Sequence, residues 1–406
     1  MSWIETNFED LYDIPSKNGL TRPAKVRGSG YKMINMGELF ANDRIGSIEM
    51  ELVPMNDREL SQMLVKQGDL LFARQSLVLS GAGKCSIVKE TNEPTTFESH
   101  IIRVRLKEEI ADPEFYYYYF KSPSCRIRSI VTQGVQAGIR GNQLKQLKVH
   151  LPPIKTQHRI AKILREYDDL IENNKRRIAL LEESARQLYK EWFVRFRFPG
   201  HEHVKVVDGV PEGWLKSAYG EVSNAVGGGT PSTKVPEYWD DGDITWFVPK
   251  DLTQNNSLIL LDSEKKITKL GLQKSSAKML PPNTIMMSSR ASIGYFGLYD
   301  GEACTNQGFI SIIPKQHNIQ MYLLHNLMFR KSEIIGLAGG TTYKEINKAT
   351  FKSIDVLLPP DTLLTEFQEY VTDLINQARL LMKQNKNLIH ARDLLLPKLM
   401  NGEIAV

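Results

Sequence analysis

The stretches IRGNQLKQLKVHLPP at residues 139–153 and INKATFKSIDVLLPP at residues 346–360 resemble each other at an offset of 207 residues. Ile, Lys, Val, Leu and the two prolines recur in register. Two further pairs of upstream segments also correspond: 115–130 with 320–335, and 68–76 with 283–291. The chain is therefore predicted to consist of two similar halves, because similarity at a fixed offset is the mark of an internal repeat.

A long helix is predicted after each Leu-Pro-Pro triplet, because proline ends a strand and is favoured at the start of a helix. In both segments apolar residues recur at alternating steps of four and three, which indicates a heptad seam. The first seam comprises Ile160, Leu164, Tyr167, Ile171, Asn174, Ile178, Leu181, Ala185, Leu188 and Trp192. The second comprises Phe367, Val371, Leu374, Ala378, Leu381, Asn385, Leu388, Arg392, Leu395 and Leu399.

The two seams match layer for layer when the helices are antiparallel. The numbers of facing residues then add to a constant, so that pairing Ile160 with Leu399 also sets Asn174 against Asn385. A buried Asn pair fixes register at some cost in stability, so Asn385→Leu is expected to raise thermal stability while loosening the register. The alternative is that each helix packs on its own globular half and that the Asn match is chance.

The predicted fold class is α+β, with two globular regions that have β-rich cores and two long antiparallel coiled-coil helices that join them. The repeat gives the fold an approximate twofold axis. The predicted boundaries are a first globular region at 1–153, a central helix at 154–198, a linker at 199–214, a second globular region at 215–360, and a C-terminal helix and tail at 361–406.

Composition limits the class of protein. The 406 residues are 41% apolar and 24% charged, which is ordinary for a folded soluble protein. No run of apolar residues is long enough to cross a membrane, and the acidic N-terminus does not resemble a secretory signal. Cys85, Cys125 and Cys304 lie far apart, so neither a disulfide framework nor a zinc site is indicated. A reducing cytoplasm is the expected location.

The distribution of charge points to a polyanionic partner. Ten Lys or Arg and no acidic residue lie between Glu114 and Glu166, and six lie between Glu264 and Asp300. Five more lie between Asp13 and Glu38. Such stretches are typical of nucleic-acid binding, although solvated cations on an ordinary surface would give the same pattern.

With these features the chain resembles the specificity subunits of type I restriction–modification systems. The residues that carry the resemblance are LKVHLPPIKTQHRIAKIL (147–164), LEESARQLYKEWF (181–193), PEGW (211–214), RASIGYFGLYDGEACTNQGFISIIP (290–314), IDVLLPPDTLLTEFQEYV (354–371) and RDLLLPKLMNGEI (392–404). The resemblance implies two target-recognition domains, each reading one half of a split, asymmetric site in double-stranded DNA.

The resemblance also implies partners. Two methyltransferase subunits would dock on the helices, and restriction subunits would join in the full complex. S-adenosylmethionine is expected in the methyltransferase, and no cofactor is expected in this chain. The cell would be bacterial or archaeal.

The length of the predicted helices is compatible with a split DNA site. A helix from Ile160 to Trp192 spans about 50 Å, which corresponds to about 15 base pairs of DNA. The DNA between the two half-sites would then not be read.

Candidate DNA contacts are Arg, Lys, Gln and small polar residues in glycine-containing loops, because Arg pairs well with guanine and Gln with adenine. In the first half they are Arg22, Lys25, Arg27, Arg74, Gln75, Gln133, Gln136 and Arg140. In the second half they are Thr230, Ser232, Lys234, Lys250, Arg290, Gln307, Thr341, Thr342, Tyr343 and Lys344. For each of these residues, solvated surface is the alternative interpretation.

Signals for catalysis or metal binding are weak. GAGKCS (81–86) looks like the end of a phosphate-binding loop, but Val78 stands where that loop needs its first glycine. His201, Glu202 and His203 have no further ligands nearby in the sequence, so no metal site is predicted. No catalytic residue is predicted. The alternatives are a self-contained nuclease or methyltransferase, a coiled-coil adaptor that does not bind DNA, and a specificity subunit of another phage-defence system.

Overall fold

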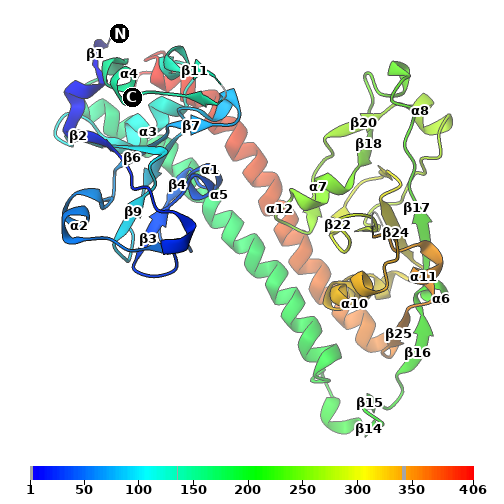
Figure 1. The fold of residues 1–406 in the computed structure, drawn as a ribbon. Coiled ribbons are helices and arrows are strands. Elements are labelled where there is room, and N and C mark those ends of the chain that lie inside the picture. Colours follow the sequence, from blue (N-terminus) through cyan, green and yellow to red (C-terminus); the bar gives the residue numbers. More distant parts are fainter. Residues whose placement is uncertain (1–2, 135, 341–343) are drawn as a thin grey trace. The chain divides into compact units, whose positions relative to one another are not determined.

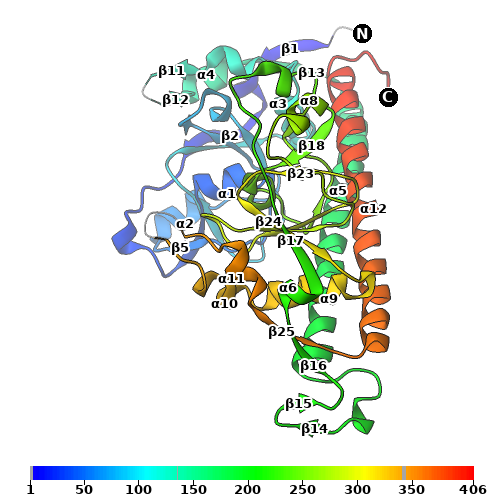
Figure 2. The same cartoon turned by 90° about the vertical axis from the view of Figure 1, so that its right-hand side faces the viewer.

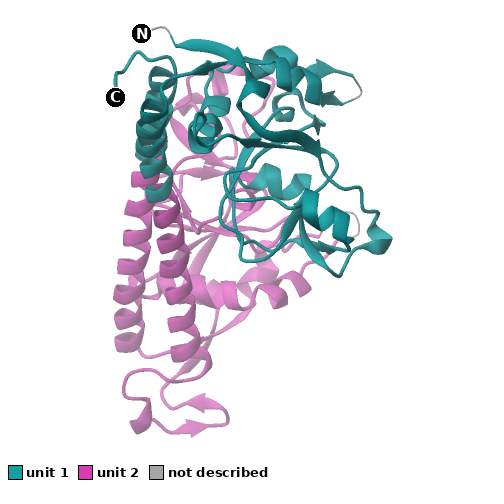
Figure 3. Cartoon of the chain, turned by 90° about the vertical axis from the view of Figure 1, so that its left-hand side faces the viewer, with its two compact units in different colours: residues 1–170, 387–406 teal, residues 171–386 magenta. Residues whose placement is uncertain are grey.

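The computed structural model describes residues 3–134, 136–340 and 344–406 (Figure 1). The chain divides into two compact units: unit 1 comprises Met1–Leu170 and Asn387–Val406, and unit 2 comprises Ile171–Lys386. Figure 3 shows that each of the two long helices passes from one unit to the other partway along its length. The predicted boundaries separate these helices from the globular regions, whereas each compact unit includes part of both.

Unit 1 is built on a five-stranded sheet, and smaller sheets accompany it. Its strand order is β2 (Tyr12–Asn18), β10 (Ile101–Leu106), β6 (Leu70–Ala73), β8 (Cys85–Val88) and β4 (Arg44–Ile45). The smaller sheets are β5 (Glu51–Val53) with β3 (Tyr31–Ile34) and β9 (Thr95–Phe97), β11 (Thr132–Gln133) with β12 (Ala137–Gly138) and β7 (Gln75–Ser76), and β1 (Ile4–Asn7) with β13 (Lys148–Leu151). The short helices are α1 (Met36–Ala41), α2 (Asp57–Met63), α3 (Pro113–Lys121) and α4 (Gly141–Gln146).

Helix α3 supplies much of the core of unit 1. It begins where the Asp112 carboxylate accepts a hydrogen bond from the backbone N–H of Glu114 at 2.9 Å, with Pro113 in the first turn. All six residues from Phe115 to Phe120 are buried, and the helix packs against β8. The run of aromatic residues that looks unusual in the sequence is therefore a packing element.

Unit 2 repeats this plan. Its five-stranded sheet has the order β17 (Ser223–Gly227), β24 (Phe309–Pro314), β21 (Ile285–Ser288), β22 (Phe296–Tyr299) and β19 (Ile259–Leu260). Its smaller sheets are β20 (Lys265–Ile267) with β18 (Ile244–Phe247) and β23 (Cys304–Thr305), β16 (Leu215–Ala218) with β25 (Asp355–Leu358), and the hairpin β14 (Val206–Val207) and β15 (Val210–Pro211). Its short helices are α6 (Tyr219–Val222), α7 (Pro249–Thr253), α8 (Lys269–Gln273), α9 (Gln320–Phe329), α10 (Lys331–Gly336) and α11 (Lys348–Lys352).

Backbone hydrogen bonds show the repeat at the level of single residues. The N–H of Ile139 donates to the carbonyl of Arg74 at 2.9 Å, and the N–H of Ile346 donates to the carbonyl of Ser289 at 3.0 Å. Ile139 and Ile346 are the residues that begin the two similar stretches of sequence. The predicted α+β class, with two repeated domains and long helices, is confirmed.

The long helices are α5 (Ile154–Tyr189), which ends in a π-helical turn at Lys190–Val194, and α12 (Asp361–Met400). They lie side by side in both Figure 1 and Figure 2. In unit 1, Ile160 and Leu399 share one core. In unit 2, the rings of Trp192 and Phe367 are 5.8 Å apart. Both pairs are those that the antiparallel seam predicts.

The polar positions of the seam are paired. The side-chain N–H of Asn174 donates to the side-chain oxygen of Asn385 at 3.0 Å, and the amide of Asn385 donates to the carbonyl of Ile171 at 3.3 Å. Both Asn side chains are buried. In unit 1, Arg392 forms an ion pair with Asp168 at 2.6 Å, and the Tyr118 hydroxyl donates to the same carboxylate at 2.7 Å. Asp168 thus links both helices to α3.

This pairing changes the expected effect of a single Asn substitution. Asn385→Leu leaves the buried amide of Asn174 without its acceptor, which costs about 1–3 kcal/mol. The double variant Asn174→Leu/Asn385→Leu removes both amides and adds apolar contact. Its free energy of unfolding should therefore exceed that of the wild type by about 2 kcal/mol. Thermal unfolding of the full chain tests both. Equal stability of the single and double variants would contradict the side-chain pairing.

Candidate nucleic-acid interface

In each unit the candidate residues gather at one edge of the five-stranded sheet. In unit 1, Asn18 and Ala73 end β2 and β6 beside Ile102 and Ile101, at the start of β10. In unit 2, Gly227 and Ser288 end β17 and β21 beside Ile310 and Phe309, at the start of β24. Because the neighbouring strands are antiparallel, the loops that follow β2 and β6, or β17 and β21, leave the sheet at the same edge.

A glycine opens this edge in both units. A Cβ on Gly19 would lie 2.0 Å from the carbonyl oxygen of Phe97, and one on Gly228 would lie 2.1 Å from the carbonyl oxygen of Thr305. Only glycine permits backbones to approach so closely. The close approach in unit 2 places Thr230 so that its hydroxyl donates to the side chain of Gln307. Two candidates separated by 77 positions in the sequence are thus neighbours.

The small sheet β11-β12-β7 brings the other candidates of unit 1 to the same edge. Gly138 pairs with Gln75, and Thr132 pairs with Gly138. Arg140 follows at the start of α4, where its backbone N–H donates to Gln143 at 3.2 Å. Gln133, Gln136 and Arg140 are exposed. Arg74, Gln75, Gln133, Gln136 and Arg140 therefore form one surface, which we call the β7 surface.

Arg22 and Arg27 brace their own loop. Arg22 forms an ion pair with Glu59 at 2.6 Å and donates to the carbonyl of Pro54 at 3.0 Å. The Arg22 guanidinium holds the pKa of the Glu59 carboxyl below its ordinary value. Arg27 pairs with Glu51 and donates to the carbonyl of Arg22 at 2.8 Å. A DNA phosphate would have to compete with these carboxylates, whereas Lys25 between them is exposed.

In unit 2, Arg290 and Lys344 lie together. Arg290 bridges to Glu345, and the guanidinium of Arg290 is 3.7 Å from the Glu345 carboxylate. The carbonyl of Lys344 accepts a hydrogen bond from Ala291 at 3.1 Å. The predicted contacts Thr341, Thr342 and Tyr343 lie outside the described residues.

Of the remaining candidates of unit 2, Ser232 and Lys234 lie in a loop and Lys250 lies in the first turn of α7. Ser232 and Lys234 are exposed, and the carbonyl of Ser232 accepts a hydrogen bond from the Trp239 indole at 3.1 Å. Lys250 pairs with Glu264 at 3.0 Å, and this hydrogen bond lowers the pKa of the Glu264 carboxyl. The basic side chain of Lys250 is thus engaged, whereas that of Lys234 is exposed.

Some residues at these edges are absent from the sequence-based set. Asn347 caps α11 by accepting from Thr350 at 2.9 Å and holds the position in the repeat that Arg140 holds in unit 1. The amine of Lys348 lies 3.5 Å from where a Cβ on Gly227 would be. Asn347 stands opposite the candidate Arg140 in the two similar stretches of sequence, whereas Lys348 stands opposite Gly141 and has no such signal. In unit 1, Arg128 of the ten-cation stretch is also absent from that set, and its guanidinium donates to carbonyls of the loop that follows β7.

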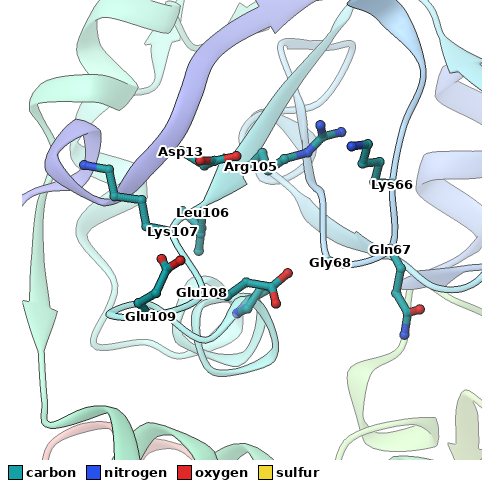
Figure 4. Close-up of a pocket in the computed structure, with 10 residues that line it drawn as sticks. Asp13, Lys66, Gln67, Gly68, Arg105, Leu106, Lys107, Glu108 and Glu109 are labelled. Atoms are coloured by element: carbon teal, nitrogen blue, oxygen red, sulfur yellow. The ribbon is translucent and has the colours of Figure 1, made fainter.

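A separate cleft in unit 1, of about 300 Å³, carries mixed charge (Figure 4). Among its lining residues are Asp13, Lys66, Arg105 and Glu108. Arg105 is engaged by the buried carboxylate of Asp69 through two hydrogen bonds of 2.7 Å. The cleft contains none of the predicted contacts.

Among the residues that the structure describes, no group of three or more His, Cys, Asp or Glu is placed to hold a metal ion. Within the same residues, none of the helices combines the length and the apolar character needed to span a bilayer.

Comparison with known proteins gives a consistent family. The model of the type I restriction modification DNA specificity domain matches residues 3–183 and again residues 211–391. The chain is 31% identical over 201 residues to the type I restriction enzyme MjaIX specificity subunit of Methanocaldococcus jannaschii, a match that covers 47% of this chain and 46% of that protein. It is 25% identical over 408 aligned positions to the HindI specificity subunit of Haemophilus influenzae, covering 84% of this chain and 87% of that protein.

A solved structure shares the fold. The S subunit of a type I restriction–modification system from M. genitalium superposes with a TM-score of 0.62 at 16% identity, covering 98% of this chain and 96% of that one.

Arg140, the exposed cation of the β7 surface, allows a test of whether this surface binds DNA. Arg140→Gln should weaken binding of a mixed-sequence duplex by about tenfold and lower the salt dependence by about one released ion. Arg177→Gln, an exposed position on α5, removes the same charge and is the matched control. Fluorescence anisotropy over a range of salt concentrations measures both. Equal losses in the two variants would show that net charge, and not this surface, determines binding.

Proposed function

Because the chain belongs to the type I restriction–modification DNA specificity family, we propose that it selects the DNA site for a methylating and cutting complex. The site is double-stranded and has two unlike halves, and each unit reads one half. The chain acts in the cytoplasm of a prokaryotic cell, where this DNA lies.

The observation that carries the proposal is one edge built twice with different side chains. The same backbone bonds place Gln75 in unit 1 and Arg290 in unit 2, and they place Arg140 and Asn347 at equivalent helix starts. Gln and Arg have different preferred bases, because one favours adenine and the other guanine. Two readers with the same frame and different side chains favour a target whose halves differ in sequence.

The long helices suit a second role as a scaffold. α5 is helical over 36 residues and α12 over 40. Exposed leucines occur on both: Leu170 and Leu180 on α5, and Leu380 and Leu394 on α12. Taken singly such leucines are ordinary on a surface, but together they give each helix apolar area that a docked protein would bury. We assign these faces to two methyltransferase subunits, with restriction subunits joining the complete assembly.

The proposal gives this chain no catalytic step of its own. The methyltransferase partner would bind S-adenosylmethionine and transfer the methyl group, and this chain would choose where. The mixed-charge cleft offers no nucleophile with an adjacent base, which an enzyme of acyl or phosphoryl transfer would need.

Modified-base sequencing tests the function. DNA is taken from cells that express this chain with its methyltransferase, and from matched cells that lack only this chain. We expect a split, asymmetric methylated motif with a fixed spacer in the first sample and its loss in the second. A continuous motif, or methylation that persists without the chain, would overturn the proposal.

A matched shortening of both helices tests whether they set the spacer. Deleting residues 171–177 of α5 and 382–388 of α12 removes one heptad from each and keeps the seam in phase. Each helix loses about 10 Å, which is about three base pairs. The methylated motif should show a shorter spacer, or methylation should fail. An unchanged spacer would refute a ruler role, and deleting only one of the two segments is the control for disrupted pairing.

A further inference from the structure

The loop between β7 and β8 presents three consecutive apolar side chains to solvent. Leu77 is 86% exposed, Val78 is 60% exposed and Leu79 is 52% exposed. An isolated apolar residue on a surface is ordinary, but a run at a loop tip is a feature that needs a partner. We call these three residues the apolar tip.

The loop that carries the apolar tip is held in place by hydrogen bonds. The Arg128 guanidinium donates to the carbonyls of Leu79 at 3.2 Å, Ser80 at 2.8 Å and Ala82 at 3.1 Å. The Ser76 hydroxyl accepts from the N–H of Val78 at 3.1 Å. These bonds fix the backbone of the loop, so burial of the apolar side chains costs little backbone conformational entropy.

The second unit provides an internal comparison. Gly83 donates to the carbonyl of Ala73 at 2.8 Å, and Gly294 donates to the carbonyl of Ser288 at 3.0 Å, so the two glycines are equivalent. Seven residues, 76–82, separate Gln75 from that glycine in unit 1, and three, 291–293, separate the equivalent Arg290 from it in unit 2, a difference of four. In the short version Ile293 is only 5% exposed. The apolar tip is therefore an addition found in the first repeat alone.

The tip is surrounded by groups suited to DNA. It follows Ser76, the last residue of β7, and extends from the β7 surface, which Figure 1 locates at the labels β7 and β11. No acidic residue lies between Asp69 and Glu90 or between Glu114 and Glu166, and these stretches contribute Arg74, Arg128 and Arg140 to this region. Asp43, near Lys84, is neutralised by Lys84 and Lys121 at 3.1 and 2.7 Å. Apart from Phe40, which lies beside Gly81 and is 39% exposed, the groups named around the tip are polar or cationic.

We propose that the apolar tip inserts as a wedge between base pairs of the half-site read by unit 1, an inference that rests on the proposed function. Apolar side chains flanked by cations unstack a base step and kink the duplex, while the cations hold the phosphates on either side. Leu77 and Leu79 are the inserting candidates. Since unit 2 lacks the tip, the distortion is confined to one half of the target.

A protein partner is the competing occupant of the tip. The exposed leucines assigned to protein contact lie on the long helices α5 and α12. The tip instead lies next to Gln75, on the surface assigned to base reading. Charge complementarity therefore favours DNA, and the experiment separates the two outcomes.

The test uses the complex of this chain with its methyltransferase and a duplex carrying the motif found by modified-base sequencing. 2-Aminopurine is placed in turn at each step of both half-sites. A methyltransferase flips its target base out of the duplex, so fluorescence should rise at that base in each half-site. The wedge predicts one additional bright step, in one half-site only. With Leu77→Ser/Leu79→Ser the additional rise should disappear, and affinity should fall by at least about tenfold, as expected for loss of a buried leucine contact.

Controls distinguish the possible failures. Ile4→Ser/Leu215→Ser removes two equally exposed apolar side chains elsewhere and should leave both signals unchanged. If the wild-type complex does not bind the duplex, the proposed function itself fails. If it binds but no step brightens apart from the bases flipped by the methyltransferase, or if the Ser variant behaves as wild type, the wedge is refuted. If the Ser variant loses the methyltransferase, as measured by mass photometry, while the assembled remainder binds DNA normally, the tip is a protein contact.

Discussion

The buried hydrogen bond between the side-chain amides of Asn174 and Asn385 ties the structure to a single register of its helices. An apolar seam alone would gain nearly as much from sliding by one heptad, because one leucine layer resembles the next. A buried amide without a partner costs about 1–3 kcal/mol, so sliding is penalised. The register in turn determines which residues of α5 and α12 join each core. In unit 1, Asp168 supports the same register because it contacts Arg392 of α12 and Tyr118 of α3.

The two repeats separate backbone from side chain in a way that suits recognition. The bonds from Ile139 to Arg74 and from Ile346 to Ser289 hold the same backbone geometry, and Gly19 and Gly228 open the same edge. None of these bonds involves a side chain that faces outward. Residues such as Gln75 and Arg290 can therefore differ without disturbing the fold that presents them. The backbone geometry and the identity of the outward-facing side chains are therefore independent, although both belong to the same strands.

The sequence alone predicts the helices, their seam and the fold class well, because heptad periodicity is a local signal in which every residue contributes. It predicts the binding edges less well, because they depend on strand pairings between distant segments. Arg22 and Arg27 look like free cations in the sequence, and only the fold brings Glu59 and Glu51 to them. Arg128 lay in a stretch already identified as basic, yet its contact with the loop at Leu79 has no sequence signature. Asn347 corresponds to the candidate Arg140 in the repeat, whereas Lys348 corresponds to Gly141, so the repeat gives a signal for Asn347 alone.

The buried pair of Asn174 and Asn385 also determines how well each half of the chain could pair with a second copy of itself. At the repeat offset of 207 residues, Asn174 corresponds to Leu381, and Asn385 corresponds to Ile178. The pair therefore breaks the symmetry of the repeat. Two copies of the first half, joined antiparallel through α5, would set each Asn174 against an Ile178, and two copies of the second half would set each Asn385 against a Leu381. Either assembly buries two amides without partners. Each half of the chain therefore pairs better with the other half than with a second copy of itself. A gene that encodes both halves together thus retains two recognition units of different sequence.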